Sequence, residues 1–295
     1  MFTISQEQRQ YLTYILADEA AKTQIEVVPE RGGIITHWRR TNQEILYLDE
    51  ARYADPTKTI RGGIPILFPI CGNLPDDTYT YQQQEYKLVQ HGFARNLPWD
   101  VIATSTNDCA SITISLKSNQ STLAVYPFAF EMVFTYQLRG NNLKILQAYT
   151  NNSDSQMPFS AGFHPYFAVD DKQKLEIEIP GTEYFSNVTK TKVAFSGSFD
   201  FELDEIDAAF TNISKNSTSF RDHGSASFAD RGKKSTIEYS DFFSTLVFWT
   251  VKGKDFICLE PWSAPRNALN TGEKLTYIEP GTTYNSGLEM ICETI

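Results

Sequence analysis

Short runs in which apolar and polar residues alternate recur along the chain from near its N-terminus to Met290. Residues 174–179 (Lys-Leu-Glu-Ile-Glu-Ile) alternate cleanly and end at a Pro-Gly pair. A period of two is typical of a strand with one face in a core. Residues 130–138 and 143–149 flank an Arg-Gly-Asn-Asn turn and predict a β-hairpin. The chain is therefore expected to consist mainly of antiparallel strands.

Two continuous apolar runs, 246–251 and 256–260, flank a Lys-Gly-Lys-Asp turn and predict strands buried on both faces. Helical periodicity is scarce, and residues 6–21 fit a helix or a strand equally well. The chain has no Gly/Ser/Pro-rich linker and no repeat. We therefore expect an all-β fold, a single domain over residues 1–295 built as a sandwich of two antiparallel sheets. The more polar residues 196–232 are expected to form a long surface excursion.

Composition excludes several classes of function. The 295 residues carry a net charge of −10, and no Lys/Arg run is present, which argues against nucleic-acid binding. The N-terminal residues lack a basic segment followed by an apolar one, and no run of about 18 apolar residues exists. We expect a cytoplasmic protein without membrane contact. An anionic ligand would need local arginines to overcome the overall charge.

The four cysteines, Cys71, Cys109, Cys258 and Cys292, form no Cys-x-x-Cys pair. With only four histidines and no metal-ligand spacing, neither a metal site nor a cofactor is expected. Apolar neighbours predict that Cys71 and Cys258 are buried thiols.

One histidine and one glutamate form a candidate acid and base pair. His164 lies in the Phe-His-Pro-Tyr-Phe sequence at 163–167, and Glu260 ends the second apolar run. An imidazole and a carboxylate held at apolar strand ends suit proton transfer. Taken singly, each has a simpler interpretation, as a structural histidine or as an ion-pair partner. His37 and His223 have polar neighbours and are not expected to take part.

Two further segments contain residue types suited to sugar binding. Arg61 precedes a Gly-Gly pair, and His91 and Arg95 lie close to Trp99 within residues 90–99. Polar donors beside aromatic rings are typical of carbohydrate pockets. The alternatives are a strained turn with a surface arginine and a loop capped by its own side chains.

In combination, four motifs resemble the aldose 1-epimerase family, the galactose-mutarotase-like enzymes. They are Arg-Gly-Gly-Ile-Pro at 61–65, His-Gly-Phe-Ala-Arg-Asn at 91–96, the sequence at 163–167, and Glu-Pro-Trp at 260–262. The hexose-6-phosphate mutarotase branch is the most similar, and the resemblance covers about residues 25–292. It implies a β-supersandwich with an open groove on one face.

The resemblance also implies roles for individual residues. His164 would be the general acid and Glu260 the general base, while Arg61 and His91 would bind the sugar. In the sugar-phosphate branch, Arg61 and Arg95 would meet the phosphate. The implied activity interconverts the α and β anomers of a hexose or hexose 6-phosphate by ring opening, without a cofactor. The expected partner is a small sugar or sugar phosphate, and the expected state is a monomer or weak homodimer.

Trp262 is a further candidate for sugar binding, and Arg266 follows in a loop, 263–272, unlike the Pro-Asp-rich segment of many galactose mutarotases. Arg266 could contact a phosphate, pair with an acid or lie on the surface. We expect at least two of Arg61, Arg95 and Arg266 to converge on one rim of the groove.

The competing hypothesis is a carbohydrate-binding or regulatory module without turnover. The presence of both His164 and Glu260 favours the enzyme, because a binder has no need for an acid and a base together. Activity near neutral pH further predicts that His164 is held protonated by a nearby carboxylate. The matching strand-end contexts of His164 and Glu260 predict that the pair faces one sugar ring across a groove.

Overall fold

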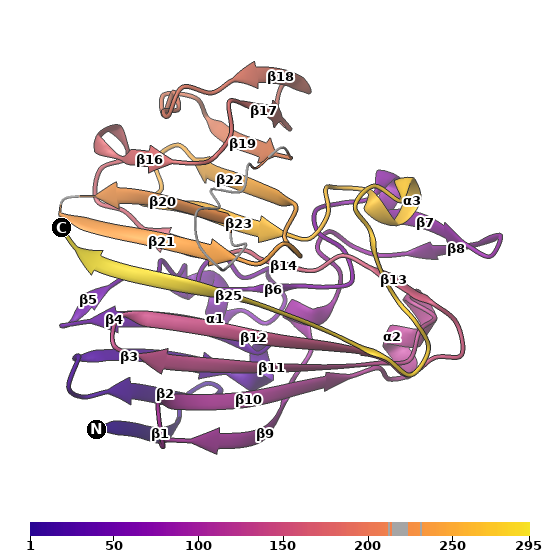
Figure 1. Cartoon of the computed structure of the whole chain (residues 1–295), viewed down its shortest axis with the longest axis horizontal. Helices are drawn as coiled ribbons and strands as arrows, with labels where there is room; N and C mark the ends of the chain where they lie inside the picture. Colours follow the sequence, from indigo (N-terminus) through magenta and orange to yellow (C-terminus); the bar gives the residue numbers. More distant parts are fainter. Residues whose placement is uncertain (212, 214–223, 231) are drawn as a thin grey trace.

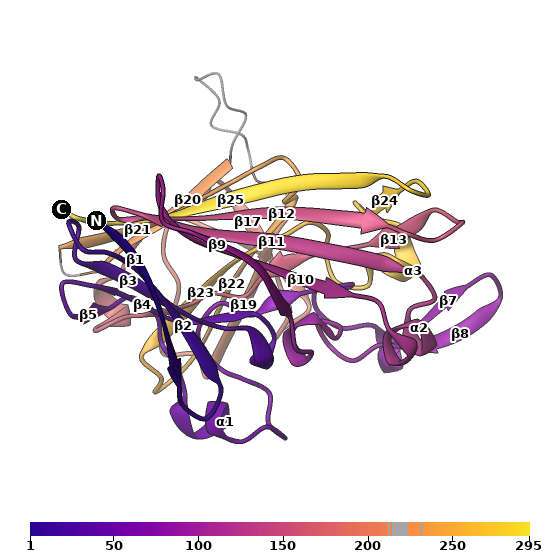
Figure 2. The ribbon, with the colours of Figure 1, turned by 90° about the horizontal axis from the view of Figure 1, so that it is seen from below.

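The computed structural model describes residues 1–211, 213, 224–230 and 232–295. Its strands form two layers, which Figure 1 shows face-on and Figure 2 shows from below. The first layer is an antiparallel sheet of eight strands. Its order is β16 (Glu176–Glu178), β20 (Gly224–Asp230), β21 (Lys233–Tyr239), β25 (Thr283–Thr294), β12 (Asn142–Asn151), β11 (Phe130–Arg139), β10 (Ala110–Lys117) and β9 (Asp100–Ser105).

The second layer contains two sheets. One has the order β18 (Thr191–Ala194), β17 (Glu183–Ser186), β19 (Glu205–Phe210), β22 (Thr245–Val251), β23 (Phe256–Trp262), β14 (Gly162–Phe163) and β6 (Ile66–Leu67), and β15 (Tyr166–Ala168) also pairs with β23. The other has the order β1 (Phe2–Gln8), β2 (Leu12–Asp18), β3 (Thr23–Val28), β4 (Ile34–Arg40) and β5 (Gln43–Glu44). Single bridges, Ile35 to Ile64 and Leu48 to Gly62, connect this second sheet to the segment that leads into β6.

Smaller elements close the ends of the sandwich. Two-stranded ribbons pair β7 (Thr78–Tyr81) with β8 (Gln84–Lys87) and β13 (Met157–Phe159) with β24 (Thr276–Ile278). The helices are short: α1 (Glu50–Ala54), α2 (Gln120–Val125), α3 (Ala268–Thr271), and 3-10 turns at Pro29–Arg31, Pro75–Asp77, Ala94–Asn96 and Lys172–Lys174. In the described ranges, no helix is long and apolar enough to cross a membrane.

The predicted antiparallel sandwich is confirmed, with the difference that its second layer consists of two sheets. Strands β11 and β12 form the expected hairpin, with Leu138 opposite Leu143, and β22 pairs with β23. Residues 6–21 form the end of β1 and all of β2, so the strand alternative is the correct one.

The prediction of a surface excursion at 196–232 is wrong for much of that stretch. Strand β19 pairs with β22 inside the second layer, and β20 belongs to the first layer. Alternating Ile206, Ala208 and Phe210 are buried, which explains why a polar stretch still forms a strand. Residues 212, 214–223 and 231, and with them His223, lie outside the described part of the chain.

The alternation of β23 separates the core from the site. Ile257 and Leu259 point into the large core between the layers. The intervening residues Cys258, Glu260 and Trp262 share the opposite face, because successive side chains of a strand point to opposite sides. All three are nonetheless at most 1% exposed. The carboxylate of Glu260 is thus carried by a strand and almost fully buried.

Candidate active site

A groove of about 340 Å³ lies over the outer face of the second layer. Its volume falls within the range of roughly 300–1,000 Å³ that is usual for small-molecule sites. All seven sequence-predicted site residues line it: Arg61, His91, Arg95, His164, Glu260, Trp262 and Arg266. The other lining residues are Arg52, Thr59, Ile60, Gln90, Tyr166, Glu205, Asp207, Val247 and Trp249. A cavity of about 440 Å³ near Arg40 and Asp230 contains none of the predicted residues.

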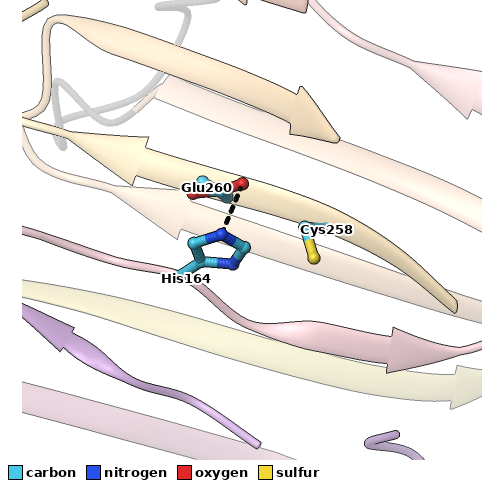
Figure 3. Close-up of side chains that lie close together, drawn as sticks. All are labelled: His164, Cys258 and Glu260. Carbon is cyan, nitrogen blue, oxygen red and sulfur yellow. Dashed lines mark ion pairs between the residues drawn. The ribbon is translucent and has the colours of Figure 1, made fainter. Parts of the chain in front are cut away.

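His164 and Glu260 are in direct contact, with 3.4 Å between Nε2 and Oε1 (Figure 3). Strand pairing explains the contact. Gly162 of β14 lies opposite Trp262, and Tyr166 of β15 lies opposite Cys258. The same register places His164, between these two strands, opposite Glu260. The predicted pairing is therefore present, but the side chains touch in the free protein and do not stand a sugar ring apart.

Glu260 is 1% exposed and accepts a hydrogen bond at Oε2 from Trp262 Nε1 over 3.1 Å. Burial raises the pKa of its carboxyl well above the usual range, and the negative charge of Asp207 adds to this effect. Arg266, the Trp262 N–H and Arg95 partly oppose the shift. The protonated form of Glu260 is therefore favoured in the free groove.

His164 is held between aromatic rings and is 8% exposed. It stacks on Tyr166, with 4.7 Å between ring centroids and 10° between planes, and meets Trp249 edge-on at 5.7 Å. Burial lowers its pKa to about 3, with Arg95 the next contributor. The expectation that a carboxylate keeps His164 protonated is wrong for the free site. Burial thus favours the neutral form of both side chains in the free protein.

His91 is a neutral donor at the base of the groove. Its Nδ1 accepts a hydrogen bond from the Gly72 backbone N–H over 3.1 Å, so the ring proton is on Nε2. Burial lowers its pKa well below the usual range. The following Gly92 has φ +68°, and a Cβ there would lie 2.2 Å from the Phe68 carbonyl oxygen. The His-Gly sequence is thus a local requirement for placing this imidazole.

The three predicted arginines share the groove but differ in what they bind. Arg266 pairs with Asp207 at 2.8 Å and lies over the Trp262 ring at 5.3 Å, so pairing with an acid is the correct alternative for it. Arg95 donates from Nη2 to the Gln90 carbonyl over 2.8 Å. The Arg61 guanidinium lies over Trp249 at 5.8 Å, and within the described residues this side chain makes no hydrogen bond or ion pair. Arg61 therefore keeps all its donors available.

Sequence reasoning missed Asp207. Its Oδ2 pairs with Arg266, and its Oδ1 accepts from Asn187 Nδ2 over 2.8 Å. Because residues 196–232 were expected to form a surface excursion, the acid was not placed in the sheet. The alternation of β19 is the signal that could have found it. Trp249 was also missed, since a continuous apolar run does not show which of its side chains line a groove.

The layered antiparallel fold and a groove containing a buried acid and base pair define a mutarotase-like β-sandwich. The aldose 1-epimerase family matches residues 15–290, and the chain belongs to that family. Membership of this family supports a general epimerase function, with a sugar as the substrate.

Several relatives are similar over much of the chain. The plasmid protein LacX of Lactococcus lactis subsp. lactis is 28% identical over 75% of this chain and 80% of its own. A candidate glucose-6-phosphate 1-epimerase of Cenchrus ciliaris is 29% identical over 59% of this chain and 54% of its own.

Solved structures agree on the fold. The Slr1438 protein from Synechocystis sp. PCC 6803 is 44% identical and superposes with a TM-score of 0.93 over the whole of both chains. Galactose 1-epimerase from Lactobacillus acidophilus NCFM superposes with a TM-score of 0.76 at 14% identity, covering 100% of this chain and 99% of its own.

Proposed function

We propose that this protein interconverts the α and β anomers of a hexose or hexose 6-phosphate, with His164 and Glu260 as the proton-transfer pair. The supporting observation is the 3.4 Å contact between these two buried groups inside a groove of suitable volume. A binding module would gain nothing from burying an imidazole against a carboxyl group, because desolvating unneeded titratable groups costs stability.

The reaction needs one proton removed from the anomeric hydroxyl and one delivered to the ring oxygen. The C1–O5 bond then breaks to give the aldehyde, C1 rotates about C1–C2, and reclosure reverses both transfers. A pair that holds one proton in total provides one acid and one base. Each positioned proton-transfer group typically contributes about 10²–10⁴-fold in rate.

The family resemblance assigns the acid to His164 and the base to Glu260. Burial favours the protonated form of Glu260 and the neutral form of His164 in the free groove, so these roles require a proton to pass to His164 when sugar binds. The arrangement with the transferable proton on Glu260 and the one with it on His164 differ only in the position of that proton. The acid of the forward reaction acts as the base of the reverse reaction. Arg266 and the Trp262 N–H, which favour the carboxylate, assist the transfer.

Sugar hydroxyls would meet the Nε2–H of His91 and the guanidinium of Arg61 on either side of the pair. Both residues line the groove, and neither donor is engaged within the described part of the chain. A guanidinium also suits phosphate, which it can contact through two N–H groups.

We propose a preference for glucose 6-phosphate over glucose, with Arg61 and Arg95 facing the phosphate. The similarity to candidate glucose-6-phosphate 1-epimerases supports this choice. Arg266 is not included, since Asp207 already engages it. The ratio of kcat/KM for the two sugars tests the preference, and equal values would remove the phosphate site.

Polarimetry on freshly dissolved α-glucose and α-glucose 6-phosphate tests the function itself. The enzyme should shorten the decay of optical rotation in proportion to its concentration. Binding of either sugar without any acceleration would instead indicate a non-catalytic carbohydrate-binding module.

A further inference from the structure

A buried thiol lies beside the proposed acid and base. Cys258 lies two residues before Glu260 on the same face of β23, and His164 approaches both (Figure 3). A nitrogen of His164, the sulfur of Cys258 and a carboxylate oxygen of Glu260 all lie within 4.8 Å of one another. All three residues are more than nine-tenths buried.

We propose that His164, Cys258 and Glu260 form an inhibitory site for a thiophilic divalent cation of the Zn²⁺ class. The cation would occupy the proton-transfer pair and stop anomerisation. The binding part of this inference stands on geometry alone, whereas the inhibition part rests on the proposed function.

The donor set and its dimensions fit such an ion. Imidazole, thiolate and carboxylate are the ligands zinc uses, at about 2.0–2.3 Å, and a tetrahedral site then separates ligand atoms by about 3.3–3.8 Å. The 3.4 Å between His164 and Glu260 already meets this spacing. The remaining separations, at most 4.8 Å, need to close by no more than about 1–1.5 Å. The fourth position would face the groove and be open to water or a sugar hydroxyl.

Burial raises the pKa values of Cys258 and Glu260 in the free protein. A divalent cation would release protons to solvent as it binds, because its ligands must be deprotonated. The Trp262 N–H on Oε2 would orient the carboxylate, as outer partners do in metal sites.

Sequence spacing could not indicate this site, because the histidine comes from a distant segment and no Cys-x-x-Cys pair is involved. Proton transfer itself has no need of the thiol. Cys258 does not line the groove, so replacing it should separate metal binding from catalysis.

The binding test uses Co²⁺ as a spectroscopic probe of the reduced, metal-free protein. Titration should produce a thiolate-to-cobalt charge-transfer band that saturates at a single ion per chain and is displaced by Zn²⁺. Cys258→Ala should abolish the band. Cys109→Ala, which removes the more accessible thiol, should retain it. Absence of the band in the wild type, or its persistence in Cys258→Ala, would overturn the site.

X-ray absorption at the zinc edge of the loaded wild type provides a readout that needs no variant. One sulfur and at least two nitrogen or oxygen ligands are expected, and a shell without sulfur would contradict the proposal. This measurement remains decisive if Cys258→Ala does not fold.

The inhibition test measures anomerisation with increasing Zn²⁺. Wild type and Cys109→Ala should lose activity, saturating sugar should protect them, and Cys258→Ala should need roughly 10–100-fold more Zn²⁺. Equal sensitivity of Cys258→Ala would refute the thiol as a ligand. A cobalt band without turnover on any sugar would refute the proposed function alone, and turnover without a band would refute the metal site alone.

Discussion

Replacing Trp262 by Phe should move the pH profile of anomerisation in a defined direction. The Trp262 N–H donates to Glu260 Oε2 over 3.1 Å and favours the carboxylate. The substitution removes this donor but keeps an aromatic ring beside His91, whose centroid lies 5.5 Å away. Without the donor, the pKa of Glu260 should rise further.

The size of the shift follows from the difference between two hydrogen bonds. A bond to an ionised acceptor contributes about 1.5–3 kcal/mol and a neutral one about 0.5–1.5 kcal/mol. The difference, about 1–1.5 kcal/mol, corresponds to about one pKa unit. The productive pair holds one proton, so the basic limb of the profile reports loss of that proton from Glu260. This limb should move up by about one pH unit.

The assay is kcat/KM against pH for wild type and variant, with circular dichroism to confirm folding. Trp249→Phe is the matched control, because it removes an N–H that donates to Glu205 over 2.7 Å in the same groove but does not touch Glu260. Its basic limb should not move. A limb that stays in place or moves down in Trp262→Phe, or an equal shift in both variants, would refute the reasoning.

Three other outcomes are expected. His164→Ala and Glu260→Gln should each lower anomerisation by about 10²–10⁴-fold while the far-ultraviolet spectrum is unchanged, and near-normal turnover would remove that residue from the mechanism. Burial alone would raise the pKa of Glu26, but hydrogen bonds from one histidine and two arginines outweigh it and hold the pKa well below its usual range. The Glu26 carboxylate should therefore stabilise the fold above about pH 4.3, and this stabilisation should be lost as the pH falls. Urea unfolding should show a loss of stability in acid that is smaller in Glu26→Gln. Gly92→Ala should lower the free energy of unfolding by clearly more than the roughly 1–2 kcal/mol expected for Gly253→Ala. Both glycines have positive φ, but only at Gly92 would a Cβ press against backbone. Equal thermal unfolding of the two variants would contradict this.

Local patterns were sufficient to predict much of the fold. The hairpin of β11 and β12 depends on alternation and a short turn, which adjacent residues encode. The pairing of β22 with β23 likewise follows from two apolar runs and the turn between them. Residues 196–232 failed as a prediction because their polar composition concealed β19, and Asp207 was lost with it.

Long-range register and burial were not predictable from the sequence. Contact between His164 and Glu260 depends on β14 and β15 pairing with β23 around them. The depth of burial, which depends on packing between segments distant in the sequence, decides the direction in which both pKa values move. Resemblance placed the two residues in one site, but it could not show that the imidazole is neutral there.

The central claim is that His164 and Glu260 catalyse anomerisation. Saturation-transfer NMR at the anomeric protons of equilibrated glucose, galactose and glucose 6-phosphate tests it most directly, because it measures exchange without an initial excess of either anomer. The account predicts enzyme-dependent exchange between the α and β signals of at least one sugar, strongest for glucose 6-phosphate and lost in Glu260→Gln. Exchange no faster than in Glu260→Gln for all three sugars would contradict it.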